Sequence, residues 1–414
     1  MEILVIVAIA AAAYMAWNIG ANDVANSMAD AVGSKALTVM WAVILAAVCN
    51  FCGAVLVGGH VTDTVRKGII ETRAFAADPR MLAHGMVCAM LGAALWLNLA
   101  SFLGMPVSTT HSIVGGIVGF GILQAGFSHI HWHKLGQIVA SWFLSPLVGG
   151  ILAFIIFRLI LRYMLSVEKP ALAARKGVPV CVFFTFTILV LAVIYKGLKN
   201  IHLNLTGLQA VALSIVCGLA AAAAAAVLIR RNSTISENHS WQHQLDQVEK
   251  TFGLLVILTS CTVAFAQGAN DVANAIGPLA AVAEIIRNNT VPGKVPVSIA
   301  HLALGGAGIA IGLAMFGYRV MYLVGTKVTE ITPSRGVAAD LAGMTTVLAC
   351  SKMGLPISTT HTLVGAIIGV GLARGITAVD KRVIGSIVAS WLLTVPIAAG
   401  ITIALYLLAK LTFL

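Results

Sequence analysis

The stretch GANDVAN occupies residues 20–26 of this chain and occurs again, letter for letter, at residues 268–274. Two longer pairs follow in the same order: GMPVSTTHSIVGGIVGFGI at 104–122 with GLPISTTHTLVGAIIGVGL at 354–372, and IVASWFLSPL at 138–147 with IVASWLLTVP at 387–396. All three pairs are separated by about 250 residues, so the chain contains an internal duplication rather than a chance repeat.

The composition identifies the class of protein that carries this duplication. The 414 residues are 59% hydrophobic and only 10% charged, whereas a soluble domain carries about 25% charged residues. Several apolar runs reach the roughly 20 residues that span a bilayer, namely Ala36–Val57, Val178–Tyr195, Leu203–Ile229 and Val383–Leu408. A membrane barrel would need alternating segments of about 10 residues, which are missing from this sequence. The sequence therefore predicts an all-α polytopic membrane protein.

The net charge of +11 does not indicate nucleic-acid binding. Basic residues such as Arg158, Arg162 and Lys169 lie in short loops between apolar runs, which is the distribution that orients membrane proteins. We therefore expect a lipid bilayer around the chain and no nucleic-acid partner.

About twelve apolar segments divide into two related halves. Residues 1–157 form the first repeat, 158–229 connecting helices, 230–250 a short polar loop, and 251–414 the second repeat. If every segment spans once, the repeats lie seven crossings apart and are inverted. If each P-x-S-T-T-H segment dips in and returns, the repeats are parallel, and the sequence leaves this choice open. Inverted repeats with broken helices are typical of secondary transporters.

The acidic motif points to a cation. Asp23 and Asp271 follow long apolar runs, where a charged carboxylate costs at least about 2.5–3.5 kcal/mol, so we expect each to face the interior and meet Na⁺ or a proton. Gly20 and Gly268 would let the helix break and free carbonyls for the ion. Amides that only join helices are the alternative. The amides of the two motifs are Asn22, Asn26, Asn270 and Asn274.

The hydroxyl motif points to an anion. We expect Pro106 and Pro356 to begin a helix, which places three hydroxyls of each copy on the first turn, beside unpaired N–H groups and the positive end of the helix dipole. These residues are Ser108, Thr109, Thr110, Ser358, Thr359 and Thr360. Helix capping alone is the alternative. His111 and His361 could either orient the turn or touch the ligand.

A carboxylate beside an anion site requires a cation or a shared proton between them, which indicates a cation-coupled anion transporter. Phosphate keeps a proton near neutral pH and can donate a hydrogen bond to a carboxylate, whereas sulfate cannot. We assign phosphate binding to Asn22, Asp23, Ser108, Thr109, Thr110, Asn270, Asp271, Ser358, Thr359 and Thr360. We assign Na⁺ binding to Asp23, Asn26, Asp271 and Asn274.

The paired GANDVAN and P-x-S-T-T-H motifs closely resemble the inorganic phosphate transporter (PiT) family, along the whole chain. The resemblance implies inverted repeats with helical hairpins, a phosphate cargo, Na⁺ or H⁺ as the coupling ion, and a homodimer. It also implies an ion or phosphate role for Asp340. The long central hydrophilic domain of animal members is absent, so we expect the cytoplasmic (inner) membrane of a microbe.

Three other functions remain as alternatives. A sulfate permease of the same family would use the same motifs. An anion channel would need a continuous pore, whereas the motifs are focal. A membrane enzyme acting on phosphate esters would need a catalytic motif such as H-E-x-x-H, G-x-S-x-G or a P-loop, and the sequence contains none of these. We therefore expect no enzymatic activity and no cofactor besides the coupling ion.

Overall fold

The computed structural model describes residues 3–58, 69–197, 205–231, 240–291, 297–353 and 357–412. The described residues form helices joined by short connections, together with an isolated antiparallel bridge between Ile70 and Ile130. Nine of the helices in these ranges are long and apolar enough to cross a membrane. The expectation of an all-helical, multi-pass membrane protein is confirmed.

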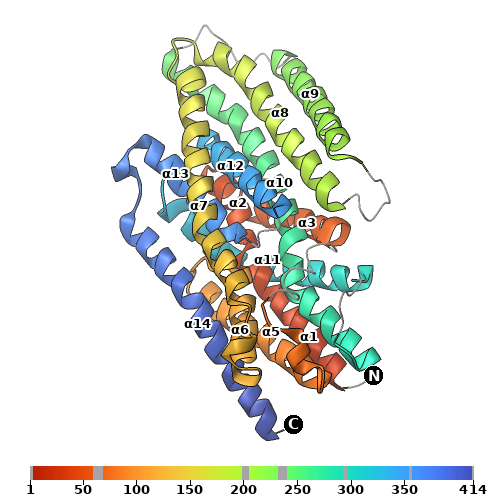
Figure 1. Cartoon of the computed structure of the whole chain (residues 1–414). Helices are drawn as coiled ribbons and strands as arrows, with labels where there is room; N and C mark the ends of the chain where they lie inside the picture. Colours follow the sequence, from red (N-terminus) through yellow and green to blue (C-terminus); the bar gives the residue numbers. More distant parts are fainter. Residues whose placement is uncertain are drawn as a thin grey trace.

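Grouped by the duplicated sequence motifs, the helices form two sets, called the first and second repeat, and a pair between them; Figure 1 shows where each helix lies. The first repeat contains α1 (Ile3–Asn22), α2 (Val24–Gly33), α3 (Val39–Val57), α5 (Pro79–Phe102), α6 (Thr109–Gln124) and α7 (Trp132–Ile160). The connecting helices are α8 (Pro170–Gly197) and α9 (Gly207–Arg231). The second repeat contains α10 (Trp241–Asn288), α11 (Ile299–Lys327), α12 (Pro333–Lys352), α13 (Thr359–Arg374) and α14 (Lys381–Thr412).

Three of the expected segments form the helices α6, α12 and α13, which are not among the nine candidate spans of the described residues. The helices α6 and α13 have 16 residues each, or about 24 Å at 1.5 Å per residue. The hydrocarbon core of a bilayer is about 30 Å thick. These helices are therefore too short to cross a membrane alone.

The first hairpin consists of α5 and α6, joined by a short loop that contains Gly104 at φ 74°. The backbone N–H of Glu71, before α5, donates to the carbonyl of His129, after α6, at 2.9 Å. The N–H of His131 donates to the carbonyl of Ile69 at 3.0 Å. The hairpin therefore starts and ends at one place in the bundle.

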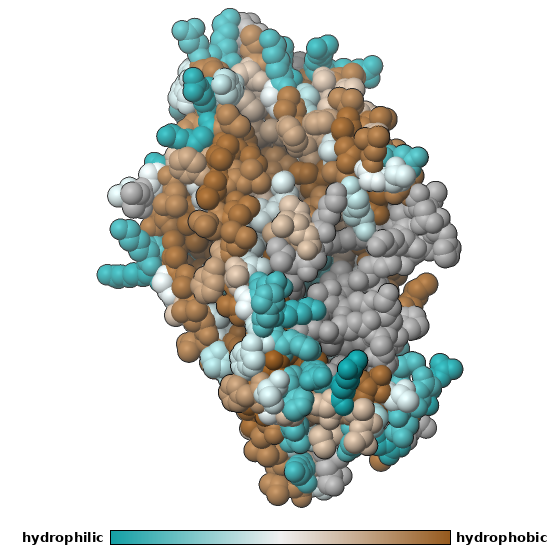
Figure 2. Space-filling view, in the orientation of Figure 1, coloured by the Kyte–Doolittle hydropathy of each residue, from teal (hydrophilic) through white to brown (hydrophobic). Residues whose placement is uncertain are grey.

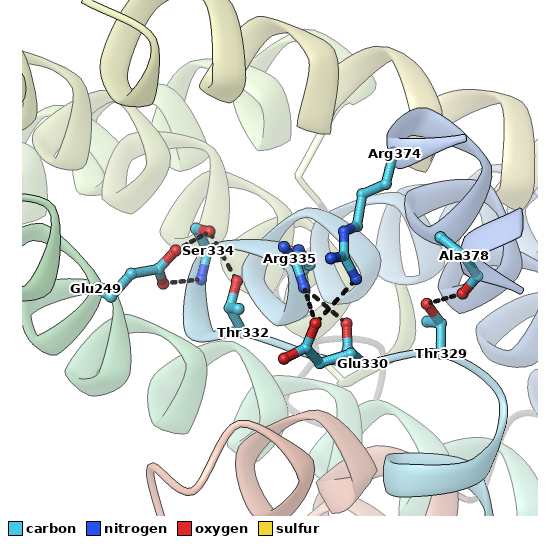
Figure 3. A network of polar contacts seen from close by, with 8 residues as sticks. All are labelled: Glu249, Thr329, Glu330, Thr332, Ser334, Arg335, Arg374 and Ala378. Carbon is cyan, nitrogen blue, oxygen red and sulfur yellow. Dashed lines mark hydrogen bonds and ion pairs between the residues drawn. The ribbon is translucent and has the colours of Figure 1, made fainter. Parts of the chain in front are cut away.

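The second hairpin, α12 and α13, closes in the same way. The N–H of Asp380 donates to the carbonyl of Val328 at 3.1 Å, and the Thr329 hydroxyl donates to the carbonyl of Ala378 at 2.8 Å. Glu330 lies 3.1 Å from Arg374 across the same junction (Figure 3). Each P-x-S-T-T-H segment is thus the returning arm of a hairpin.

The two repeats pack against each other through exchanged partners. The first helix of each repeat packs against the second helix of the other, α1 on α11 and α10 on α3. A Cβ added to Gly20 would lie 1.8 Å from the carbonyl oxygen of Ile309, and one added to Gly268 would lie 2.1 Å from that of Asn50. The glycine that opens each GANDVAN motif therefore allows two helix backbones to touch.

Several boundaries differ from those expected. The boundary between α1 and α2 falls at Asp23, whose own backbone stays helical at φ −75° and ψ −41°, and α10 runs unbroken through Gly268. The predicted helix break in the second copy was therefore wrong, because Gly268 keeps a regular helix while it allows close packing, as Gly20 also does. Pro106 lies upstream of α6, which begins at Thr109, while Pro356 lies outside the described residues. The part of the expected polar loop from Trp241 to Lys250 is the start of α10.

The surface carries the apolar belt that a bilayer requires. Figure 2 shows a broad hydrophobic area, with hydrophilic residues above it at the upper end of the molecule and again over the lower part. Exposed apolar side chains follow one side of α7, among them Phe143, Leu147 and Ile151. Leu392, Leu393 and other apolar side chains do the same on α14. These side chains contact lipid rather than water.

Candidate functional site

Both hairpins present a helix N-terminus to the interior. Ser108 is the N-cap of α6, and its hydroxyl accepts from the backbone N–H of His111 at 3.2 Å. Ser358 caps α13 in the same way, accepting from His361 at 3.2 Å. The following threonines are buried on the first turn of each helix. The structure thus builds the two predicted clusters of hydroxyls at the positive ends of two helices.

Asp23 contacts both of these helix starts. The hydroxyl of Thr109, on α6, donates to Asp23 Oδ2 at 2.6 Å, and the hydroxyl of Thr360, on α13, donates to Asp23 Oδ1. The side chain of Gln267, on α10, donates to the Asp23 carbonyl at 3.2 Å. One buried carboxylate therefore joins residues of both repeats.

The second copy repeats this arrangement. The Thr359 hydroxyl donates to Asp271 Oδ2 at 3.2 Å, as Thr109 does to Asp23. The Asn274 amide donates to the hydroxyls of Thr109 and Thr110 at 3.2 and 3.4 Å. The corresponding Asn26 amide donates to Thr360 at 3.4 Å. Each aspartate thus binds the first threonine of the hairpin in its own repeat, and Asp23 also binds Thr360 of the other hairpin. The asparagines bind hydroxyls of the opposite hairpin, so the four motifs lie together.

Asn22 holds the first hairpin in place. Its amide donates to the Ser101 hydroxyl at 3.1 Å and to the Met105 carbonyl at 2.9 Å, while its Oδ1 accepts from the N–H of Val107 at 2.9 Å. Both the nitrogen and the oxygen of the amide are therefore hydrogen-bonded, to the end of α5 and to the loop before α6. The equivalent Asn270 is half-buried on α10, and part of the corresponding loop, residues 354–356, lies outside the described residues.

Gln267 is a site residue that sequence reasoning missed. Its Oε1 and the Oδ1 of Asn26 are buried acceptors that have no hydrogen-bond partner within the described ranges. Acceptors without donors suit a cation, since a buried polar group otherwise loses its hydration without compensation. A polar residue directly before Gly268, where the first copy has Ile19, was the available signal.

The two histidines form a stack across the two repeats. The ring of His111 lies 3.5 Å from that of Trp142, on α7, and 4.3 Å from that of His361. His361 in turn stacks on Trp391, on α14, at 3.7 Å. The tryptophans belong to the duplicated IVASW stretches. The stack therefore fixes the first turns of both hairpin helices against the long helices behind them.

The buried cluster combines two kinds of polar group. Hydroxyls and helix N-termini donate hydrogen bonds to an anion, while carboxylate and amide oxygens coordinate a hard cation. The described residues contain no cluster of three His, Cys, Asp or Glu that would suit a transition metal. The cluster therefore holds donors that suit an anion next to oxygen acceptors that suit a hard cation.

Comparison with known proteins agrees with this geometry. The chain is 45% identical to a protein of Pyrococcus abyssi named as a phosphate permease, over 95% of this chain and 94% of the relative. It is 42% identical to the chloroplastic inorganic phosphate transporter 2-1 of Arabidopsis thaliana, over 94% of this chain and 69% of that protein. A solved structure described as the sodium-dependent phosphate transporter is 40% identical, matches with a TM-score of 0.91, and covers 100% of both chains.

A family model reaches nearly from end to end of the sequence. The model described as the phosphate transporter family matches residues 19–402, which include both GANDVAN motifs and both hairpins. The duplicated motifs thus meet in one buried cluster, and the family model covers nearly the whole chain. The chain belongs to the phosphate transporter family.

Proposed function

We propose that this protein imports inorganic phosphate across the cytoplasmic membrane of a microbe by symport with Na⁺. The observation that carries the proposal is the position of Asp23, which accepts hydroxyls from both hairpin helices, Thr109 on α6 and Thr360 on α13. A carboxylate in contact with both hydroxyl clusters links cation binding to anion binding directly.

The coupling follows from competition for these hydroxyls. The hydroxyls of Thr109 and Thr360 donate to Asp23, so they are not free to donate to phosphate. A cation bound to the Asp23 carboxylate, with Asn26 Oδ1 and Gln267 Oε1 as further ligands, would neutralise the charge and release the hydroxyls. Phosphate would then bind only when the cation is present, which is the requirement for symport.

The choice of anion rests on the acids. Hydrogen phosphate can donate a hydrogen bond to the carboxylate of Asp23 or Asp271, whereas sulfate would leave a buried carboxylate facing an anion with no hydrogen to donate. Phosphate is also the substrate named for the relatives and for the solved structure. Phosphate is therefore the proposed cargo, and sulfate is the competitor to test.

The choice of cation rests on the ligands. The acceptors around Asp23 are oxygen atoms of carboxylate, amide and hydroxyl groups, which hard cations prefer. The solved structure that matches this chain is described as sodium-dependent. Na⁺ is therefore the proposed coupling ion, with a proton as the alternative.

Inverted repeats and alternating access belong to the same proposal. Each hairpin is built from two of the expected segments, α5 with α6 and α12 with α13, and starts and ends at one place, so it adds no net crossing. The two repeats are then related by an odd number of crossings, through α1–α2, α3, α7, α8 and α9, and would be inverted. The parallel count would apply only if the P-x-S-T-T-H segment returned by itself while α5 crossed. Residues 1–157 and 251–414 would then approach the shared site from opposite sides of the membrane. A homodimer in the membrane completes the proposal.

The proposal is tested by uptake of radiolabelled phosphate into proteoliposomes with an imposed Na⁺ gradient or an imposed proton gradient. We expect the Na⁺ gradient to drive uptake and unlabelled arsenate to inhibit it far better than sulfate, because arsenate also carries a proton. Liposomes without protein are the control. Uptake driven only by the proton gradient would replace Na⁺ by H⁺, and equal inhibition by sulfate would contradict phosphate selectivity.

A further inference from the structure

The helices α7 and α8 follow each other in the chain but diverge from their connection. Figure 1 shows them meeting at the upper end of the molecule and separating below it. The helix α7 packs against α12 and α13, whereas α8 packs against α9 and α10. A groove of about 1030 Å³ remains between them, lined by side chains of both helices and of α12. The described residues that line it include none of those assigned to phosphate or Na⁺ binding.

Hydrogen bonds hold the connection between α7 and α8 in place. A short π-helix, Leu161–Leu165, follows α7, and after it the Val167 carbonyl accepts from the Trp241 side chain at 3.0 Å. The N–H of Ala171, in the first turn of α8, donates to Gln244 Oε1 at 3.3 Å. Trp241 and Gln244 both belong to the start of α10. The upper end of the groove is therefore fixed to a third helix.

The walls of the groove are apolar along most of its length. Ile156 on α7, Phe184 on α8 and Leu341 on α12 line it. Thr345, which also lines it, donates its hydroxyl hydrogen to the Leu341 carbonyl at 2.6 Å. The lining of α8 lies within residues 172–188, which span about 24 Å along a helix. This length exceeds half of the hydrocarbon core, which is about 30 Å thick, so the groove can hold an extended acyl chain of one leaflet.

The groove opens toward the bilayer. Three apolar side chains that line it, Leu159, Val180 and Phe184, are about half exposed. They belong to helices that are long and apolar enough to cross a membrane. Exposed apolar side chains on such helices contact hydrocarbon, and an acyl chain matches the chemistry of these walls.

The end of the groove at the helix connection is charged. Lys169 and Lys176 line it together with Tyr163 and Glu168, and both lysines are exposed. Residues 158–176 carry five basic residues and one acid. Basic side chains at the end of a membrane helix attract anionic headgroups, and tyrosine is enriched at the level where headgroups lie. The groove is therefore apolar along its length and positively charged at one end.

We propose that this groove binds one anionic phospholipid, with its phosphate group beside Lys169 and Lys176 and an acyl chain along the apolar walls. A second copy of the chain docked here by twofold symmetry would bring two identical basic ends together on one face of the membrane, which disfavours a protein partner. The lipid contacts Leu341 on α12, an arm of the second hairpin. The site goes beyond the proposed phosphate symport and does not depend on it.

The test is native mass spectrometry of the purified full-length chain, titrated with dioleoyl phosphatidylglycerol or with dioleoyl phosphatidylcholine. We expect one phosphatidylglycerol to bind more tightly than phosphatidylcholine. The double variant Lys169→Ala/Lys176→Ala should weaken phosphatidylglycerol binding about thirtyfold, because two charges beside the headgroup are lost, and should weaken phosphatidylcholine far less. The control Lys381→Ala/Lys410→Ala removes two exposed charges from α14 and should bind both lipids as the wild type does.

A second variant fills the groove without changing its charge. Val180→Trp places a large ring on the apolar wall and should abolish this binding of both lipids. Val148→Trp, at an exposed position of α7 outside the residues that line the groove, is its control and should bind as the wild type does. Size-exclusion chromatography and the melting temperature check that each variant is folded.

Three results would overturn the proposal. Equal affinities for the two lipids would remove the role of the headgroup, and an unchanged phosphatidylglycerol affinity in the lysine variant would place the lipid elsewhere. A dimer that Val180→Trp converts to a monomer, with lipid binding unchanged, would make the groove an interface between two copies. No phosphate and no ion gradient enter the measurement, so its result is independent of the outcome of the uptake experiments.

Discussion

At the scale of single residues, the contacts of Asp23 explain how a very apolar chain can bury an acid. Its carboxylate accepts from Thr109 and Thr360, so it lies between the N-termini of α6 and α13. The partial positive charge at these helix ends offsets part of the cost of burying the carboxylate. An ion that binds the Asp23 carboxylate would therefore also change its hydrogen bonds with Thr109 and Thr360.

Replacing Asp23 by Asn tests this role. The amide keeps the size of the side chain but removes the charge that a cation needs, so we expect the Na⁺-driven uptake of phosphate to be lost. Phosphate binding to the purified variant should no longer depend on the Na⁺ concentration. Asp246→Asn, which removes an exposed acid near the start of α10, is the matched control and should transport normally. Loss of the pH dependence with an intact Na⁺ response would assign the residue to proton coupling instead.

At the scale of helices, the GANDVAN glycines hold the repeats together. A Cβ at either glycine would overlap backbone of the opposite repeat, at Ile309 for Gly20 and at Asn50 for Gly268. We expect Gly20→Ala and Gly268→Ala each to destabilise the protein by about 1–3 kcal/mol, because the added methyl group overlaps a carbonyl oxygen. Gly385→Ala, whose Cβ meets nothing within 4 Å, is the control.

Thermal unfolding in detergent measures this effect. The melting temperature should fall for the two motif glycines and stay equal or rise for Gly385→Ala, since alanine favours a helix. Equal melting temperatures for all three variants would mean that the helices can separate without cost, and would contradict the packing role.

The sequence motifs predicted which residues lie at the helix starts better than they predicted the course of α10 and the hydrogen bonds between the two repeats. The N-caps Ser108 and Ser358 and the hydroxyls after them follow from local rules that hold for any helix start. The unbroken course of α10 through Gly268 does not follow, because a glycine signals a helix break and close packing equally well. The bonds from Asn26 and Asn274 to the opposite hairpins join residues more than 160 apart in sequence, which no local pattern encodes.

At the scale of the whole molecule, inverted repeats would place matching hairpin ends on opposite faces of the membrane. Ser128 follows α6, Thr377 follows α13, and both are exposed. We expect Ser128→Cys and Thr377→Cys, each in a chain whose seven native cysteines are replaced, to react with a membrane-impermeant thiol reagent from opposite sides. Labelling of both from one side would support parallel repeats.

The central claim is that the two repeats build one shared phosphate site rather than one site each. The direct measurement is the number of phosphate ions bound per chain by the purified protein at saturating Na⁺. We predict one phosphate per chain, with both Thr109→Val and Thr359→Val weakening that same site, because their hydroxyls belong to one connected cluster. Two phosphate ions per chain, with one lost in each variant, would contradict the account.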